Sequence, residues 1–217
     1  MPYNYQQSLN SDKALIWRIV HRDNLPWILA NGLHCGNGGP RSPAWVSIGN
    51  EDLISKRANH GVPAGPGGVL GEYVPFYFTP FSVMLKNIHS GRGAVKQRAN
   101  AEIVILVSSL HHIKEQGLAY VFTDGHAYIE LTNFYTDLAD LDKIDWEILQ
   151  QRNFKRDQDD PAKFERYQAE ALIHKHCPVA GLLGIVCYTN LLKINIEQQV
   201  AESGHKLAVH TRPGWYF

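Results

Sequence analysis

The predicted strands are short, and short helices or glycine-rich stretches separate them along the whole chain of 217 residues. Apolar and β-branched runs predict strands over residues 14–20, 73–78, 102–107, 119–122, 169–174 and 182–187, with short final strands at 205–209 and 215–217. Capping residues predict short helices over 23–29, 51–59, 79–88 and 145–150, another after Ser109, and an amphipathic helix over 191–203. Because long βαβ units are too few for a doubly wound sheet, the pattern predicts an α+β fold, in one domain over residues 1–217.

Two segments, residues 33–43 and 61–71, are too rich in glycine and proline for regular structure. We predict that both are loops. Loops of this length inside a compact domain usually carry function or are disordered.

The charge balance, 21 Lys and Arg against 21 Asp and Glu, excludes a uniformly basic nucleic-acid coat but not a local basic patch. Three cysteines without a CxxC pair predict reduced thiols, and neither a signal peptide in MPYNYQQSLNSDK nor a membrane-spanning run is expected. We therefore expect a cytoplasmic protein.

Several chemical motifs are missing from the sequence. It has no GxGxxG after a strand, no GxxxxGK[ST] and no GxSxG, which disfavours a Rossmann domain, a P-loop and an α/β-hydrolase. His174 and His176 are expected on one face of a strand beside Cys177, but no second cluster has zinc-like spacing, so we predict no metal site.

Glu170 is the most informative single residue, because its neighbours in QAEALIH are apolar and a carboxylate there is costly unless it is paired or faces a cleft. Ordinary structural roles suffice for the other candidates: His21 as a cap, Arg57 as a solvated charge, Tyr77 in packing and Asp124 in a turn. From patterning alone, a functional and a structural role for Glu170 are equally supported.

Four segments in this order resemble the DarT family of DNA ADP-ribosyltransferase toxins over nearly the whole chain. They are the HxxNLxxILxxG pattern beginning at His21, VPFYFTPFSVML, TDGHA and QAEALIH. The resemblance implies an ADP-ribosyltransferase fold, with a split, twisted β-sheet core and an NAD⁺ cleft. It also implies transfer of ADP-ribose from NAD⁺ onto a base of single-stranded DNA, and an antitoxin partner, DarG, whose macrodomain removes the modification.

The resemblance also implies residue roles. It makes Glu170 and Arg57 the catalytic residues, and Arg57, always charged, is better suited to binding pyrophosphate or polarising the base than to acting as a base itself. The cofactor-binding residues that it implies are His21, Asn24, Gly49, Arg57, Tyr77, Met84 and His126.

The loop over residues 152–168 corresponds in the family to the substrate-recognition loop. Its basic residues, interleaved with Phe154 and Tyr167, are the predicted DNA contacts: Arg152, Lys155, Arg156 and Arg166. The acidic residues within the loop leave a solvated charged loop as the alternative. A second candidate patch comprises Arg92, Lys96 and Arg98.

Overall likeness favours thymine over guanine as the modified base. Two other functions remain open at this point. The same fold could act on RNA or another acceptor, or the chain could be a non-catalytic nucleic-acid-binding module in which Glu170 is paired in the core.

Overall fold

The computed structural model describes residues 5–217, so residues 1–4 of the segment in which we expected no signal peptide lie outside the described residues. The strands are β1 (Leu15–His21), β2 (Leu33–His34), β3 (Tyr73–Tyr77), β4 (Ile103–Ser109), β5 (Tyr120–Thr123), β6 (Phe134–Tyr135), β7 (Glu170–His174), β8 (His176–Cys177), β9 (Gly184–Cys187) and β10 (Ala208–Thr211). The α-helices are α1 (Leu25–Asn31), α2 (Glu51–Ala58), α3 (Val83–Ser90), α4 (Leu110–Glu115), α5 (Trp146–Gln151), α6 (Lys163–Arg166) and α7 (Asn190–Glu202).

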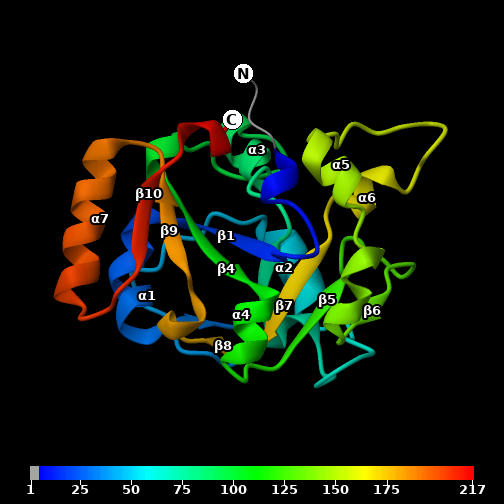
Figure 1. Cartoon of the computed structure of the whole chain (residues 1–217), viewed down its shortest axis with the longest axis horizontal. Helices are drawn as coiled ribbons and strands as arrows, with labels where there is room; N and C mark the ends of the chain where they lie inside the picture. Colours follow the sequence, from blue (N-terminus) through cyan, green and yellow to red (C-terminus); the bar gives the residue numbers. More distant parts are fainter. Residues whose placement is uncertain (1–4) are drawn as a thin grey trace.

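One large sheet forms the centre of the molecule, with the strand order β10-β9-β4-β1-β3-β7-β5-β6 (Figure 1). β1 pairs with β4 along its full length, from Leu15 to His21, and β3 pairs with β7 from Tyr73 to Tyr77. Between β1 and β3, however, the register holds only Trp17 opposite Tyr77. The sheet is thus nearly divided into two halves, which confirms the expected α+β fold with a split sheet.

Most neighbouring strands are antiparallel. β9 and β10 are parallel and are joined through α7, as a parallel pair requires a crossover connection.

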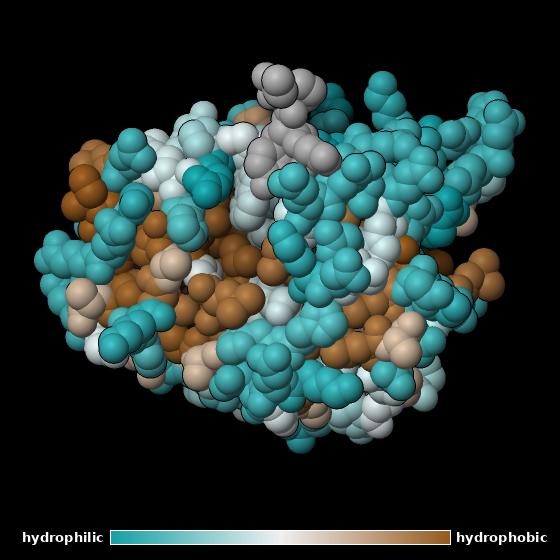
Figure 2. Space-filling view, viewed as in Figure 1, coloured by the Kyte–Doolittle hydropathy of each residue, from teal (hydrophilic) through white to brown (hydrophobic). Residues whose placement is uncertain are grey.

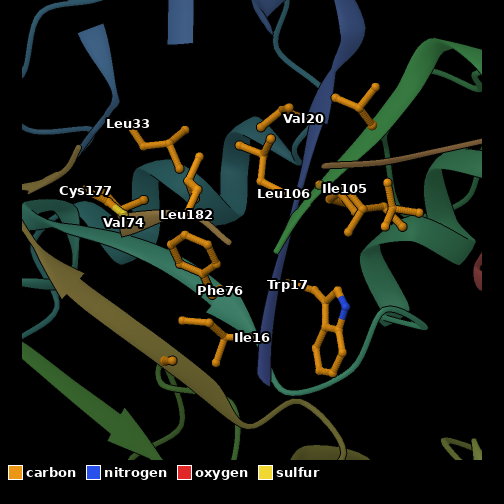
Figure 3. Packing of buried hydrophobic residues seen from close by; sticks show 14 of the residues in the cluster. Ile16, Trp17, Val20, Leu33, Val74, Phe76, Ile105, Leu106, Cys177 and Leu182 are labelled. Carbon is orange, nitrogen blue, oxygen red and sulfur yellow. The ribbon is translucent and has the colours of Figure 1, made fainter. Parts of the chain in front are cut away.

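Apolar side chains from both halves of the sheet meet in one core (Figure 3). Phe76 and Val74 of β3 lie beside Leu33 and Leu182, while Trp17 of β1 is 1% exposed. The side chains therefore hold the halves together where the backbone ladder is sparse.

A smaller apolar cluster lies apart from this core. It is made by Val62, Leu70, Tyr73, Val121, Ala127 and Leu172. Because it includes residues of the segment 61–71, it anchors that glycine-rich loop against β3, β5 and β7.

Both glycine-rich segments are irregular apart from β2 and a 3-10 turn at Leu70–Glu72, and they meet. The Asn37 amide N–H donates to the Gly71 carbonyl at 2.8 Å, and its side-chain Nδ2 donates to the Ala58 carbonyl at 2.9 Å. A Cβ at position 71 would lie 2.4 Å from the Asn37 side chain, so this close approach requires glycine. The two loops are therefore joined at the carboxyl end of α2.

Several sequence predictions were wrong in detail. His174 and His176 do not share a strand, because Lys175 adopts φ +60° and the chain turns there from β7 into β8. Residues 213–215 form a 3-10 turn instead of a final strand at 215–217, and Pro213 in the first position of the turn favours it. The helix predicted from residue 79 begins at Val83, after Ser82 caps it. The short strands β2, β6 and β8 were missed, and the strand predicted at 205–209 lies at Ala208–Thr211.

No helix within residues 5–217 is both long and apolar enough to span a membrane. All three cysteines are buried free thiols.

Candidate active site

A buried ion pair joins β7 to α2. Glu170, the first residue of β7, is 1% exposed, and Arg57 lies in the last turn of α2. Arg57 donates from Nη1 to Oε1 of Glu170 at 2.8 Å and from Nη2 to Oε2 at 2.6 Å. This two-pronged contact fixes the plane of the carboxylate.

The pair keeps Glu170 ionised. Burial alone would raise the pKa of the Glu170 carboxyl, but the charge and hydrogen bonds of Arg57, with the Ala127 amide, outweigh it and lower that pKa. Reciprocally, burial would lower the pKa of Arg57, and the Glu170 carboxylate raises it instead. Near neutral pH the site therefore holds a buried, oriented carboxylate.

The segment between β5 and β6 completes the surroundings of this carboxylate. The Ala127 amide donates to Glu170 Oε1 at 3.1 Å, and the Glu170 amide donates to Thr123 Oγ1 at 3.0 Å. Asp124 accepts from the Asn133 amide at 3.0 Å and from the Tyr135 hydroxyl at 3.1 Å. The TDGHA segment is thus a loop held by hydrogen bonds, and its Ala127 N–H points to Glu170.

Tyr77 and His126 lie next to the ion pair. Tyr77 stands opposite Glu170 in the β3–β7 ladder, and burial followed by the Glu170 charge raises its pKa to about 12. His126 Nδ1 accepts from the Tyr128 amide at 3.3 Å, and burial lowers the pKa of its imidazole. Both side chains are therefore uncharged at neutral pH.

Arg18 was missed as a functional candidate. It lies on β1 among apolar neighbours, donates from Nη1 to the Pro75 carbonyl at 2.7 Å, and its buried Nε has no partner among residues 5–217. Burial lowers its pKa to about 10, and Tyr77, Arg41 and Arg57 are close enough to influence that value. The criterion that singled out Glu170, a charge in an apolar strand, would have found it.

His21 lies at the other end of β1 from the ion pair. Trp17 stands opposite Tyr77, which in turn stands opposite Glu170, and His21 lies four residues or roughly 13 Å beyond Trp17. The Nδ1 of His21 accepts from the Asp23 amide at 3.2 Å, and Arg98 Nη1 lies 3.3 Å from its Nε2. The same Nε2 lies 3.5 Å from Glu102 Oε1. The structure therefore places His21 in a separate polar network.

Asn24 is 2% exposed, and its side-chain amide binds the Val46 backbone in both directions. Nδ2 donates to the Val46 carbonyl at 2.8 Å, and Oδ1 accepts from the Val46 amide at 2.8 Å. Asn24 thus fixes the end of the segment that leads to Gly49. A Cβ at Gly49 would lie 2.7 Å from the Ile54 methyl group on α2.

Met84 lies in the first turn of α3, partly buried against the main core. Within the described chain, Met84 is not among the residues that bind the side chains of Glu170 and Arg57.

The four predicted DNA-contacting residues differ in their surroundings. Arg166 donates twice to Asp160, at 2.8 and 2.7 Å, and once to Asp145 at 3.0 Å, which favours a structural role for it. Arg152 lies 3.6 Å from the centre of the Phe81 ring, and Arg156 packs on Phe164; Lys155 is exposed.

No group of three or more His, Cys, Asp or Glu residues within 5–217 could hold a metal ion. The observed arrangement offers instead an ionised carboxylate, a paired guanidinium and an aromatic ring in one place.

Comparison with known proteins decides the family. A family model described as "ssDNA thymidine ADP-ribosyltransferase, DarT" matches residues 17–217. The chain belongs to the DarT family. It is accordingly an NAD⁺-dependent DNA ADP-ribosyltransferase.

Individual DarT relatives match the chain closely. A DNA ADP-ribosyl transferase of Escherichia coli O127:H6 (strain E2348/69 / EPEC) is 61% identical over 217 residues, which is 100% of both chains. Thermus sp. 2.9 DarT in complex with ADP-ribosylated ssDNA superposes with a TM-score of 0.86 and 32% identity, over 95% of this chain and 97% of that one. The same protein in complex with NAD⁺ gives a TM-score of 0.81 and 33% identity, over 95% and 98% of the chains.

Thermosipho africanus DarTG in complex with ADP-ribose shares only the fold. Its TM-score is 0.73 at 18% identity, over 94% of this chain and 51% of that one. These findings confirm the expected ADP-ribosyltransferase fold and NAD⁺ as co-substrate.

Proposed function

We propose that this protein transfers ADP-ribose from NAD⁺ onto a thymine base of single-stranded DNA and releases nicotinamide and a proton, with Glu170 and Arg57 as its catalytic residues. The choice of thymine rests on the description of the matching family. The observation that carries the residue assignment is the buried Arg57–Glu170 pair at the divided part of the sheet.

Glu170 acts electrostatically. Breaking the bond between nicotinamide and ribose leaves positive charge on the sugar, and a fixed carboxylate beside it stabilises that charge without reorganising. The lowered pKa of Glu170 keeps the group ionised for this task.

Arg57 holds that carboxylate in place. Both of its terminal nitrogens bind Glu170, so positioning and charge are its first role, ahead of the pyrophosphate binding or base polarisation that we expected. Tyr77, opposite Glu170, offers an aromatic face to the nicotinamide ring.

The remaining cofactor contacts are part of the proposal. We assign His21, Gly49, Met84 and His126 to the NAD⁺ cleft from the family resemblance. Asn24 acts there by fixing the segment around Val46.

The biological setting is proposed too. We propose that the protein is a toxin and that its partner is a DarG antitoxin. The name of the Thermosipho structure, DarTG, supports this pairing. Three free thiols agree with a cytoplasmic location.

The test is to incubate the protein with NAD⁺ and single-stranded oligonucleotides, and then to digest the DNA and identify the modified nucleoside by mass spectrometry. We expect an ADP-ribosyl adduct on thymidine. Glu170→Gln should lower its formation by at least about 10³-fold, because the amide cannot stabilise positive charge.

Removing one partner of a buried ion pair costs about 3–5 kcal/mol, so the folding of Glu170→Gln has to be checked by circular dichroism. Glu170→Asp keeps the negative charge, but its shorter side chain places the carboxylate farther from the sugar. This variant should also lose most activity while remaining folded. Glu165→Gln makes the same chemical change nearby and should stay active. Label on RNA or protein alone would favour another acceptor, and full activity of a folded Glu170→Gln would favour a non-catalytic role for Glu170.

A further inference from the structure

A pocket of about 550 Å³ opens between the carboxyl end of α5, the helix α3 and the last residue of the chain. The residues of its lining that matter here are Lys86, Arg152, Phe154, Lys155 and Phe217, and we call it the Lys86 pocket. None of its lining residues is Asp or Glu. Its side chains therefore combine positive charge with aromatic surface.

The cations of the Lys86 pocket differ from those of the adjoining loop. Within residues 5–217, Lys86, Arg152 and Lys155 form no ion pair with a carboxylate. Lys163 and Arg166, by contrast, pair with Asp157 and Asp160. Lys163 and Arg166 are thus neutralised within the loop, whereas the cations of the pocket are left for an external anion.

Aromatic rings hold these cations in place. Lys86 Nζ lies 4.7 Å from the centre of the Phe154 ring, and the Arg152 guanidinium lies 3.6 Å from that of Phe81 and 5.6 Å from that of Phe217. Phe154 and Phe217 are only partly buried, with ring centres 6.1 Å apart. A base can therefore contact an aromatic edge while its phosphates meet the lysines.

The pocket is close to the proposed catalytic centre. Phe154 packs against Tyr167 with ring centres 5.0 Å apart, and Tyr167 precedes Glu170 by three residues, at most about 11 Å of chain. Figure 1 shows α3, α5 and the carboxyl terminus gathered at the end of the sheet where β7 begins. Figure 2 shows that the surface around α5 and α6 is mainly hydrophilic.

We propose that the Lys86 pocket binds a nucleotide of the single-stranded DNA that flanks the modified base. Lys86 and Lys155 contact the phosphodiester, and Phe154 and Phe217 contact the base. Arg152 adds positive charge to the pocket. This proposal rests on the proposed function, because it places the flanking strand of that same substrate.

The test measures binding of fluorescein-labelled oligothymidylates of about 15 and about 5 nucleotides by anisotropy at several salt concentrations, without NAD⁺. Lys86→Gln and Lys155→Gln should each weaken binding of the longer strand several-fold. Each should also reduce the slope of log affinity against log salt by about 0.7. Phe154→Ala should weaken it about tenfold or more without changing that slope. The short strand should be much less affected.

Lys114→Gln on α4 removes the same charge outside the pocket and serves as the matched control. Unchanged affinity and slope in both lysine variants, or an equal loss in Lys114→Gln, would overturn the proposal. So would a loss of NAD⁺ affinity, measured by calorimetry, in the pocket variants. Modification of DNA by the unaltered protein is scored separately, so that its absence counts against the proposed function and not against the pocket.

Discussion

At the scale of single residues, the site consists of charges buried where burial is expensive. Glu170 meets that cost with two hydrogen bonds from Arg57 and one from Ala127. Arg18 meets it only in part, because one hydrogen bond to Pro75 leaves its buried Nε without a partner in the described chain. A side chain that is poorly compensated in the fold is a candidate for a role in the reaction.

We expect Arg18→Met to change the free energy of unfolding by no more than about 1 kcal/mol, because relief from burying a charge offsets the lost hydrogen bond. The value of kcat/KM for NAD⁺ should fall about tenfold or more, because three arginines converge here and the dinucleotide is anionic. Urea denaturation and nicotinamide release measure the two effects.

Arg212→Met, an exposed arginine, is the control and should change neither quantity. A large destabilisation in Arg18→Met, with an activity loss explained by unfolding, would show that Arg18 only supports the fold.

At the scale of elements, loops that the sequence leaves irregular are fixed by a few side chains. Asn24 binds Val46, and Asn37 joins the two glycine-rich segments at the end of α2, which carries Arg57. The loop before β7 is held by Arg166 in the same way. The position of the catalytic pair therefore depends on contacts made by irregular backbone.

Asn24→Ala should raise KM for NAD⁺ about tenfold with a smaller change in kcat, since it frees the segment around Val46. It also leaves two backbone groups without partners, at a cost of about 1–3 kcal/mol. Steady-state kinetics and thermal denaturation measure both effects.

Asn24→Asp keeps the acceptor but loses the donor, so its KM for NAD⁺ should lie between those of the unaltered protein and of Asn24→Ala. Asn31→Ala removes an exposed amide from α1 and should leave KM unchanged. An equal rise in KM in Asn24→Ala and Asn31→Ala would contradict a specific role for Asn24.

At the scale of the whole molecule, the sheet is divided between β1 and β3, and the ion pair closes the structure near that division. Three histidines in different parts of the fold, His34, His126 and His174, have pKa values lowered mainly by burial. Because folding favours the neutral form of all three imidazoles, the free energy of unfolding of the whole molecule depends on pH.

Stability should therefore fall as the pH drops through about 6.5. Below that pH the histidines bind protons in the unfolded chain, whereas in the folded chain their lowered pKa values keep them neutral. Acidification therefore favours the unfolded state. The urea midpoint should be lower at about pH 5.5 than at about pH 7.5.

His126→Gln should reduce this pH dependence, because it removes one of the three groups. A midpoint that stays constant or rises on acidification would contradict the expectation.

The sequence by itself determined the fold class, most strands and helices, both loops and the special position of Glu170, because periodicity, capping and burial cost are local properties. It could not specify that Arg57 binds Glu170 across 113 residues, since that depends on the order of strands in the sheet. It also grouped Arg166 with Lys155, although one pairs with carboxylates and the other lines an open pocket. The tertiary structure decided these points, because the partner of a charge is set by the elements that pack around it.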